Sequence, residues 1–300
     1  MSGHGPCARA LAAVDPDGRK GWRCRPYRQA REAELLRLED ARGRPLALAK
    51  VYNGRRAAAK AEVERRGLEA LAATGTVAVP AVVAAMPDGL VMDWIEPAGC
   101  PAGGALARTL GEDLAALHAL PAPAYGLPFG NAVGVLSGPT PSYEQAGPFY
   151  VRERLDPLVT ALAARGAPAA LLDRLQAARE VLARRLPSPV PALLHGDLWS
   201  GNWLPGRGPD GRCRPYLIDP AVLWGDPVSE LAFSECFGGF PAAFYEAYRA
   251  LRPLPPDYRT WLRPAYQLYH ALMHWWLFGD GYRSWVAELV ELVLQAHPTH

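Results

Sequence analysis

The first third of the chain alternates apolar and polar side chains over short runs, which is the pattern of half-buried strands. The turn-forming residues 40–44 lie between two such runs, and residues 87–89 lie between two others. A helix is predicted between the two pairs, over residues 55–73, where helix-forming residues predominate and apolar positions recur at a helical spacing. The predicted strands are residues 34–39, 46–52, 77–86 and 90–95. This part of the chain therefore predicts a small sheet that carries one helix.

Beyond a Pro- and Gly-rich stretch at residues 97–104, the pattern changes to longer segments with helical periodicity. Helices are predicted over residues 106–120, 149–165, 169–186, 228–251, 261–278 and 284–295. A strand-rich insertion at 193–219 separates the third of these helices from the fourth. We place a boundary at the Pro- and Gly-rich stretch, so that residues 1–96 form a small sheet unit and residues 97–300 a larger helical unit.

Composition narrows the classes of function. The 300 residues are 50% hydrophobic and 21% charged, which is enough apolar side chains to fill a core. The 32 basic residues nearly balance the 30 acidic ones, for a formal net charge of +2. This balance argues against a nucleic-acid partner held by bulk charge, and the Arg-rich stretch at residues 19–31 is interpreted as a solvated face.

The N-terminal residues lack the apolar core of a signal peptide, and no run approaches about 18 apolar residues. We therefore expect no membrane partner and a cytoplasmic location. The five cysteines are widely spaced and form no C-x-x-C pair. Their odd number and spacing argue against a disulfide framework or a zinc site and favour a reducing compartment.

The densest chemical motif is His195-Gly-Asp-Leu-Trp-Ser-Gly-Asn202, which a short hairpin separates from Asp219. An aspartate followed five residues later by an asparagine is the spacing of a kinase catalytic loop. Phosphoryl transfer needs a carboxylate at the incoming hydroxyl and oxygen ligands for Mg²⁺ beside the phosphates. Asp197 and Asn202 can present both groups to one cleft, and Asp219 follows an apolar strand, as the metal-binding aspartate of a kinase does. Without these flanking residues, Asp197 and Asn202 would be explained more simply as turn caps.

Lys50 is the second candidate, because it lies on a predicted strand among apolar neighbours, where an ammonium group is costly unless it meets an anion. The chain has only three lysines among its 32 basic residues, so a compact ammonium here favours a point contact with phosphate. Glu64 on the following helix is the predicted partner of Lys50, and Glu62 is the alternative on another helix face. In the absence of the catalytic loop, a lysine at a sheet edge and a solvated glutamate would explain these residues.

These features resemble the fructosamine/ketosamine-3-kinase family, within the protein-kinase-like superfamily that also holds aminoglycoside phosphotransferases. The superfamily pattern is the His-Gly-Asp, Asn and Asp series described above. The resemblance runs from about residue 34 to residue 296 and is most specific in the C-terminal half. Its narrower motifs are Trp199-Ser-Gly-Asn202, Ile218-Asp-Pro-Ala-Val222, Glu235-Cys-Phe-Gly-Gly-Phe-Pro241, Tyr266-Gln-Leu-Tyr-His270 and Leu277-Phe-Gly-Asp-Gly-Tyr282.

The resemblance implies an α+β, bilobal protein-kinase-like fold with ATP between a small N-terminal sheet lobe and a larger helical lobe. Asp197 would take or orient the proton of the acceptor hydroxyl, while Asn202 and Asp219 would hold Mg²⁺. Lys50, paired with Glu64, would steady the ATP phosphates.

The resemblance also implies how the two substrates are bound. The strand that leads through Met92 and Asp93 to Ile95 would be the hinge, whose backbone groups meet adenine. Trp199 would stack on the sugar, and His270 and Trp275 are assigned to the wall of the sugar pocket or to the helix core beside it. The acceptor would be the 3-hydroxyl of a ketosamine, free or on a glycated protein, in a deglycation step.

One departure from the family keeps other functions open. The family has glycines in its first hairpin, where the backbone approaches phosphate, but residues 28–33 contain none. A pseudokinase that binds nucleotide or sugar without turnover is therefore one alternative, and an aminoglycoside-type phosphotransferase is another. His195 is expected to brace the catalytic loop, and Glu230 to be either an anchor of that loop or a chemical group. The sequence leaves the oligomeric state open.

Overall fold

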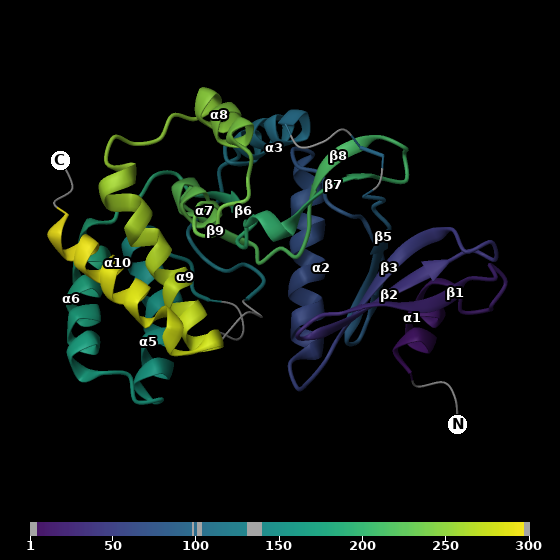
Figure 1. Cartoon of the computed structure of the whole chain (residues 1–300), viewed down its shortest axis with the longest axis horizontal. Helices are drawn as coiled ribbons and strands as arrows, with labels where there is room; N and C mark the ends of the chain where they lie inside the picture. Colours follow the sequence, from purple (N-terminus) through teal and green to yellow (C-terminus); the bar gives the residue numbers. More distant parts are fainter. Residues whose placement is uncertain (1–4, 98, 101–103, 131–139, 297–300) are drawn as a thin grey trace.

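The N-terminal part of the chain is a five-stranded antiparallel sheet in the order β1-β2-β3-β5-β4. The computed structural model describes residues 5–97, 99–100, 104–130 and 140–296. The strands are β1 (Arg23–Gln29), β2 (Ala33–Glu39), β3 (Pro45–Tyr52), β4 (Val82–Met86) and β5 (Gly89–Asp93). Figure 1 shows this sheet to one side of a mostly helical remainder.

Two helices, α1 (Pro6–Val14) and α2 (Ala57–Thr74), pack on opposite faces of the sheet. Successive side chains of a strand point to opposite faces, so β3 serves both helices. Ala47 shares a buried cluster with α1, whereas Leu48 packs with Leu68 of α2. Lys50 falls in the same alternate series as Leu48, which directs its side chain to the face that α2 covers.

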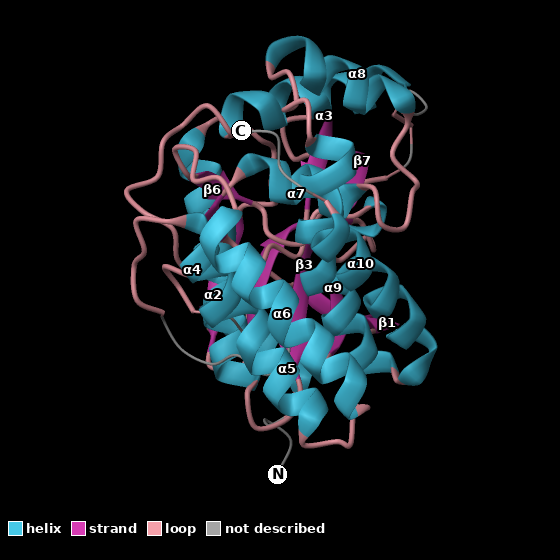
Figure 2. Cartoon of the chain, turned by 90° about the vertical axis from the view of Figure 1, so that its left-hand side faces the viewer, coloured by secondary structure: helices cyan, strands magenta, loops and turns pink. Residues whose placement is uncertain are grey.

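The C-terminal part is built mainly from helices, which face the viewer in Figure 2. They are α3 (Gly104–Leu117), α4 (Ala146–Phe149), α5 (Asp156–Ala163), α6 (Ala169–Arg185), α7 (Pro227–Ser234), α8 (Ala242–Leu251), α9 (Arg263–Phe278) and α10 (Arg283–Gln295). A π-helical stretch at Tyr150–Leu155 joins α4 to α5. The largest buried cluster lies here, and α5, α6, α9 and α10 contribute most of it.

Two short ribbons lie between the sheet and the helices. Strand β6 (Ala192–Leu194) pairs with β9 (Leu223–Gly225), and β7 (Trp203–Arg207) pairs with β8 (Cys213–Leu217). A buried cluster that includes Leu71 of α2, Leu110 of α3 and Leu217 of β8 joins the two parts of the chain. The motif at residues 195–202 connects β6 to β7 and therefore lies where the two parts meet.

Most predicted elements are present within a few residues, and the exceptions have local causes. Strand β4 begins at Val82 rather than at residue 77, after the break that Pro80 imposes. The predicted helix 228–251 is two helices, because Gly238 and Gly239 adopt φ of +64° and +94° between α7 and α8. Among the described residues, no helix combines the length and apolar character that crossing a membrane requires.

Helix α1 and strand β1 were not predicted. All but one of the side chains of β1 are exposed, so the alternation that identifies a half-buried strand is absent from its sequence. The interpretation of the Arg-rich stretch as a solvated face agrees with this exposure.

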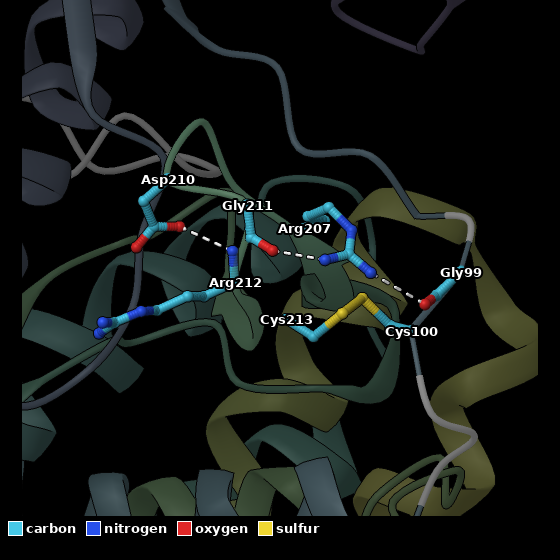
Figure 3. Close-up of a disulfide and its surroundings, with 7 residues drawn as sticks. All are labelled: Gly99, Cys100, Arg207, Asp210, Gly211, Arg212 and Cys213. Atoms are coloured by element: carbon cyan, nitrogen blue, oxygen red, sulfur yellow. Dashed lines mark hydrogen bonds between the residues drawn. A yellow bond between two sulfur atoms is a disulfide. The ribbon is translucent and has the colours of Figure 1, made fainter.

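The expectation of no disulfides is wrong. Cys7 is bonded to Cys24, and Cys100 to Cys213, while Cys236 is free. The folded chain brings α1 against β1, and the segment after β5 against the β7–β8 hairpin, as Figure 3 shows for the second bond. Arg207 strengthens the second junction by donating to the Gly99 carbonyl at 3.2 Å. Residues 98 and 101–103 of the predicted boundary lie outside the described residues.

Candidate functional site

The loop between β6 and β7 carries Asp197, which lines the cavity beside Lys50, and the buried Asn202. The side-chain amide of Asn202 donates to the backbone carbonyl of Asp197 at 2.9 Å and to its carboxylate at 2.8 Å. Burial raises the pKa of Asp197 to about 7, although the hydrogen bond from Asn202 and the nearby charge of Arg154 oppose the rise. A carboxylate with a pKa near neutral pH suits proton transfer from a hydroxyl group.

Glu230 of α7 fixes the backbone of this loop. Its carboxylate accepts from the amide of His195 at 3.1 Å and from the amide of Gly196 at 2.6 Å. His118 of α3 lies 3.0 Å from the same carboxylate. Burial opposes the charge of Glu230, but these partners hold its pKa below the usual value. Of the two roles proposed for Glu230, the structure supports the anchor of the loop.

His195 braces the loop from its other side, as predicted. Its Nε2 lies 2.9 Å from the carbonyl oxygen of Ile218, so Nε2 must carry a proton. The amide of Asp197 donates to Nδ1 of the same ring at 3.4 Å. Burial lowers the pKa of His195, which agrees with a neutral ring held by these two bonds. His195 therefore ties the catalytic loop to the segment that carries Asp219.

Lys50 lies between two carboxylates. Its Nζ is 3.0 Å from Oε1 of Glu64 and 2.9 Å from Oδ1 of Asp219. Tyr52, two residues along β3, donates a hydrogen bond to the other oxygen of Glu64. Burial disfavours the ammonium, but the two carboxylates raise the pKa of Lys50 well above its usual value. The predicted Lys50–Glu64 pair is confirmed, whereas Glu62 pairs with Arg65 on the outside of α2.

A cavity of about 570 Å³ opens in front of this charged group. It is lined by Lys50, Glu64, Asp197 and Asp219, together with the turn between β1 and β2 and the end of α9. That turn lacks glycine, and its Arg31 reaches α9, where it donates to the Leu277 carbonyl at 3.3 Å. Arg31 also lies over the ring of Phe278. The first hairpin thus reaches across the cavity to α9 with an arginine side chain.

Asn202 and Asp219 have the chemistry to hold a divalent cation together with phosphate oxygens. Because the amide nitrogen of Asn202 is used by Asp197, its carbonyl oxygen is left for a ligand. The side chain of Asp219 is 49% exposed to the cleft, and its backbone has a φ of +54°. Positive φ at a residue other than glycine is costly and is concentrated at functional sites. Oxygen donors of this kind suit Mg²⁺.

The predicted hinge follows β5. Met92 is buried on β5, and Ile95 is buried just beyond its end. The amide of Asp93 donates to the Ala81 carbonyl at 2.9 Å, so this amide is not available for the role given to the Asp93 backbone. A backbone pair between Glu96 and Arg207 then ties the segment to β7.

A second cavity, of about 500 Å³, lies on the other side of Asp197. Trp199 stands at its edge with 39% of its surface exposed, and the exposed Phe237 and Phe278 also line it. His270 lines the same cavity and stacks on Phe233 at 3.5 Å between ring centroids. Asp197 therefore forms a wall of both cavities.

Trp275 does not line this cavity. It belongs to the buried cluster of the helical part, and its indole nitrogen donates to Asp280 at 2.8 Å. Its position on α9 turns it toward the core, whereas His270 and Met273 on the same helix reach the cavity. The prediction that Trp275 lines the sugar pocket is therefore wrong, and the other interpretation of this residue, packing in the helix core, is confirmed.

Sequence reasoning missed several residues that line the second cavity, above all Arg154, Phe237 and Tyr269. Phe237 lies in a segment that was predicted to be the middle of a helix. Arg154 lies in Arg152-Glu-Arg-Leu-Asp156, where four of five residues are charged, so no sequence feature distinguishes it from its neighbours.

Comparisons with known proteins find a family and a fold that this chain resembles. A model of the fructosamine kinase family matches residues 48–296. The "Probable ketoamine kinase" of Synechocystis is 36% identical over 245 residues, which are 78% of this chain and 78% of that protein. The "Protein-ribulosamine 3-kinase, chloroplastic" of Oryza sativa is 34% identical over 250 residues, which are 80% of this chain and 70% of that protein.

A solved structure of a "putative fructosamine-3-kinase" from Thermobifida fusca superposes with a TM-score of 0.81 at 25% identity. The match covers 97% of this chain and 98% of that one. The predicted α+β, kinase-like fold is therefore confirmed.

Proposed function

Because this chain belongs to the fructosamine kinase family, we propose that it transfers the γ-phosphoryl group of ATP to the 3-hydroxyl of a ketosamine. The proposal rests on one observation. Asp197 lines two cavities whose walls differ in chemistry. The first cavity holds the Lys50 ammonium beside two carboxylates, as a phosphate site needs. The second is mainly aromatic and apolar, as a site for the apolar faces of a sugar needs.

In the proposed reaction, the acceptor oxygen forms a bond to the γ-phosphorus as the bond from that phosphorus to the ADP oxygen breaks. Asp197 orients the acceptor hydroxyl and receives its proton. Lys50, held by Glu64, binds phosphate oxygens of ATP, and the backbone of the hinge around Asp93 and Ile95 meets adenine. Mg²⁺, held by Asn202 and Asp219 together with the phosphates, would neutralise charge on the transferred group.

The charge of the second cavity argues against a polycationic antibiotic as acceptor. Among the described residues that line it, Asp197 is the only carboxylate, and Arg154 adds a positive charge. A ketosamine phosphorylated at the 3-hydroxyl would be expected to release its amine, so the proposed role is the deglycation of free amines or proteins.

The test is ATP- and Mg²⁺-dependent phosphate transfer, followed by mass spectrometry, to fructosamine, ribulosamine and erythrulosamine derivatives. An aminoglycoside and a reaction without acceptor run beside them. We expect a gain of one phosphate on ketosamines alone. Transfer to the aminoglycoside alone would replace this proposal, and binding of ATP without any transfer would favour the pseudokinase alternative.

A further inference from the structure

Arg154, which lines the second cavity, is a buried cation that forms no ion pair with a carboxylate among the described residues. Only 5% of its surface is exposed, and its Nη1 is buried without a hydrogen-bond partner. Its guanidinium lies 3.8 Å from the ring centroid of Tyr269, a stacking contact that leaves the edge of the guanidinium free to donate. A buried charge that lacks hydrogen bonds is costly, so such a group is expected to have a use.

Three acidic residues line the cavities to which Arg154 contributes, Asp197 the second cavity and Asp226 and Glu230 a smaller one, and each accepts hydrogen bonds from other groups. Asp226 accepts from the amide of Val228 at 2.9 Å and from the hydroxyl of Tyr266 at 2.7 Å. Glu230 accepts from the backbone of the catalytic loop, as described above. Asp197 is bound by Asn202 and faces the acceptor hydroxyl. None of these carboxylates forms an ion pair with Arg154, although the charge of Arg154 acts on nearby Asp197.

The guanidinium faces the place where the acceptor must lie. It lines the second cavity together with Asp197 and His270, and its positive charge lowers the pKa of both residues. The pKa of His270 falls well below its usual value, mainly through burial, so this ring adds no charge near neutral pH. Arg154 is thus the fixed positive charge of the cavity among the described residues.

We propose that Arg154 is a specificity-determining residue that binds an oxyanion carried by the acceptor. This inference rests on the proposed function and adds the chemical class of the acceptor. A planar guanidinium with free donors matches the two oxygens of a carboxylate or a phosphate. The oxyanion has two possible sources, which are a carboxylate on the amine half of the ketosamine and a phosphate ester on its sugar.

The experiment compares matched acceptors. The first acceptor is the ribulosamine of glycine, which carries a carboxylate. The second is the ribulosamine of glycinamide, in which an amide of nearly equal size replaces the carboxylate. The third is the 5-phosphate of the glycinamide derivative, in which the anion lies on the sugar. We expect kcat/KM for one of the two anionic acceptors to exceed that for the glycinamide derivative by about 10- to 100-fold, the range of a hydrogen bond to a charged group. In Arg154→Met this preference should disappear, and in Arg154→Lys part of it should remain.

Two controls separate recognition from a structural effect. His270→Gln alters the same cavity without removing a charge, and it should change kcat/KM for all three acceptors by the same factor. The rise in Tm on adding ATP should persist in Arg154→Met, because Arg154 does not line the nucleotide cavity.

An equal kcat/KM for all three acceptors in the wild-type protein would overturn the inference without any variant. A preference that survives in Arg154→Met, or a loss that is equal for all acceptors, would also overturn it. If the glycinamide derivative is phosphorylated but neither anion gives a gain, only this inference fails. If ATP binds and no ketosamine is phosphorylated, the proposed function is wrong, and this inference, which depends on it, is wrong as well.

Discussion

Without nucleotide, Asp197→Asn should be more stable than the wild type by a margin that grows as the pH rises, although it removes the carboxylate proposed to be catalytic. Burial raises the pKa of Asp197 from 3.8 to about 7, so the folded state keeps a proton that the unfolded state releases between these values. The wild-type protein therefore loses stability as the pH rises from about 4 to about 7, after which the loss is constant. The amide of the variant never ionises and escapes this loss.

The size of the effect follows from the same pKa. Each pH unit between the two values corresponds to about 1.4 kcal/mol, so about 2.7 kcal/mol accrues between pH 5 and pH 7. Because the carboxylate lies in an open cleft, solvent reaches it and reduces the cost of its charge. We therefore expect at least roughly half of this free energy difference. The chain has 300 residues, and the unfolding entropy is about 2.1 cal/mol/K per residue. With this entropy, a change in free energy between half and all of that value corresponds to a change of about 2–4 °C in Tm.

The assay is the Tm of both proteins at pH 5 and pH 8 without nucleotide. The advantage of Asp197→Asn over the wild type should grow by about 2–4 °C between these pH values, while phosphate transfer falls by at least about 100-fold. Asp173→Asn, an exposed position on α6, serves as the matched control and should show no such trend. An advantage that does not depend on pH, or a variant less stable than the wild type at pH 8, would refute the assigned burial of the charge.

Three further predictions concern the framework around the site. Gly111→Ala should destabilise the protein by more than about 3 kcal/mol in urea unfolding, because its Cβ would lie 2.3 Å from a backbone carbonyl of α8. Gly104→Ala, at the open start of α3, should be neutral or stabilising in the same assay, and equal losses would contradict the close helix contact. Glu230→Gln should lower kcat and cost about 1–3 kcal/mol of unfolding free energy, because an amide cannot accept all of the hydrogen bonds that the carboxylate accepts; unchanged kcat and stability would refute its role as the loop anchor. Peptide mapping without reduction should recover Cys100 linked to Cys213, and Cys213→Ser should cost about 3–5 kcal/mol for a loop of this length, whereas recovery of both as free thiols would contradict the bond.

The sequence predicted the parts of the site that short stretches of chain bring together. Asp197 and Asn202 are five residues apart in one loop, and their contact needs only the local turn. Lys50 and Glu64 are 14 residues apart on a strand and the next helix, so strand alternation and one helix face suffice to pair them.

The sequence could not show which helical faces meet. The aromatic residues of α9 are spaced all around the helix, so periodicity alone did not separate His270, which lines the second cavity, from Trp275, which lies in the core. Phe237 reaches the cavity because paired glycines with positive φ end α7 and redirect the chain toward α8. The exposed strand β1 left no alternating pattern to find.

The sequence by itself determined most of the elements, the proposed catalytic loop and the chemistry of its charged residues, because each depends on neighbours along the chain. Tertiary structure alone decided the two disulfides and the position of Arg154 in the wall of the second cavity. It also decided the hydrogen bond between Glu230 and the amide of Gly196, 34 residues away in the chain. These features join segments whose approach depends on packing of the whole core. Side-chain periodicity shows that a residue is buried, but it does not show what the residue is buried against.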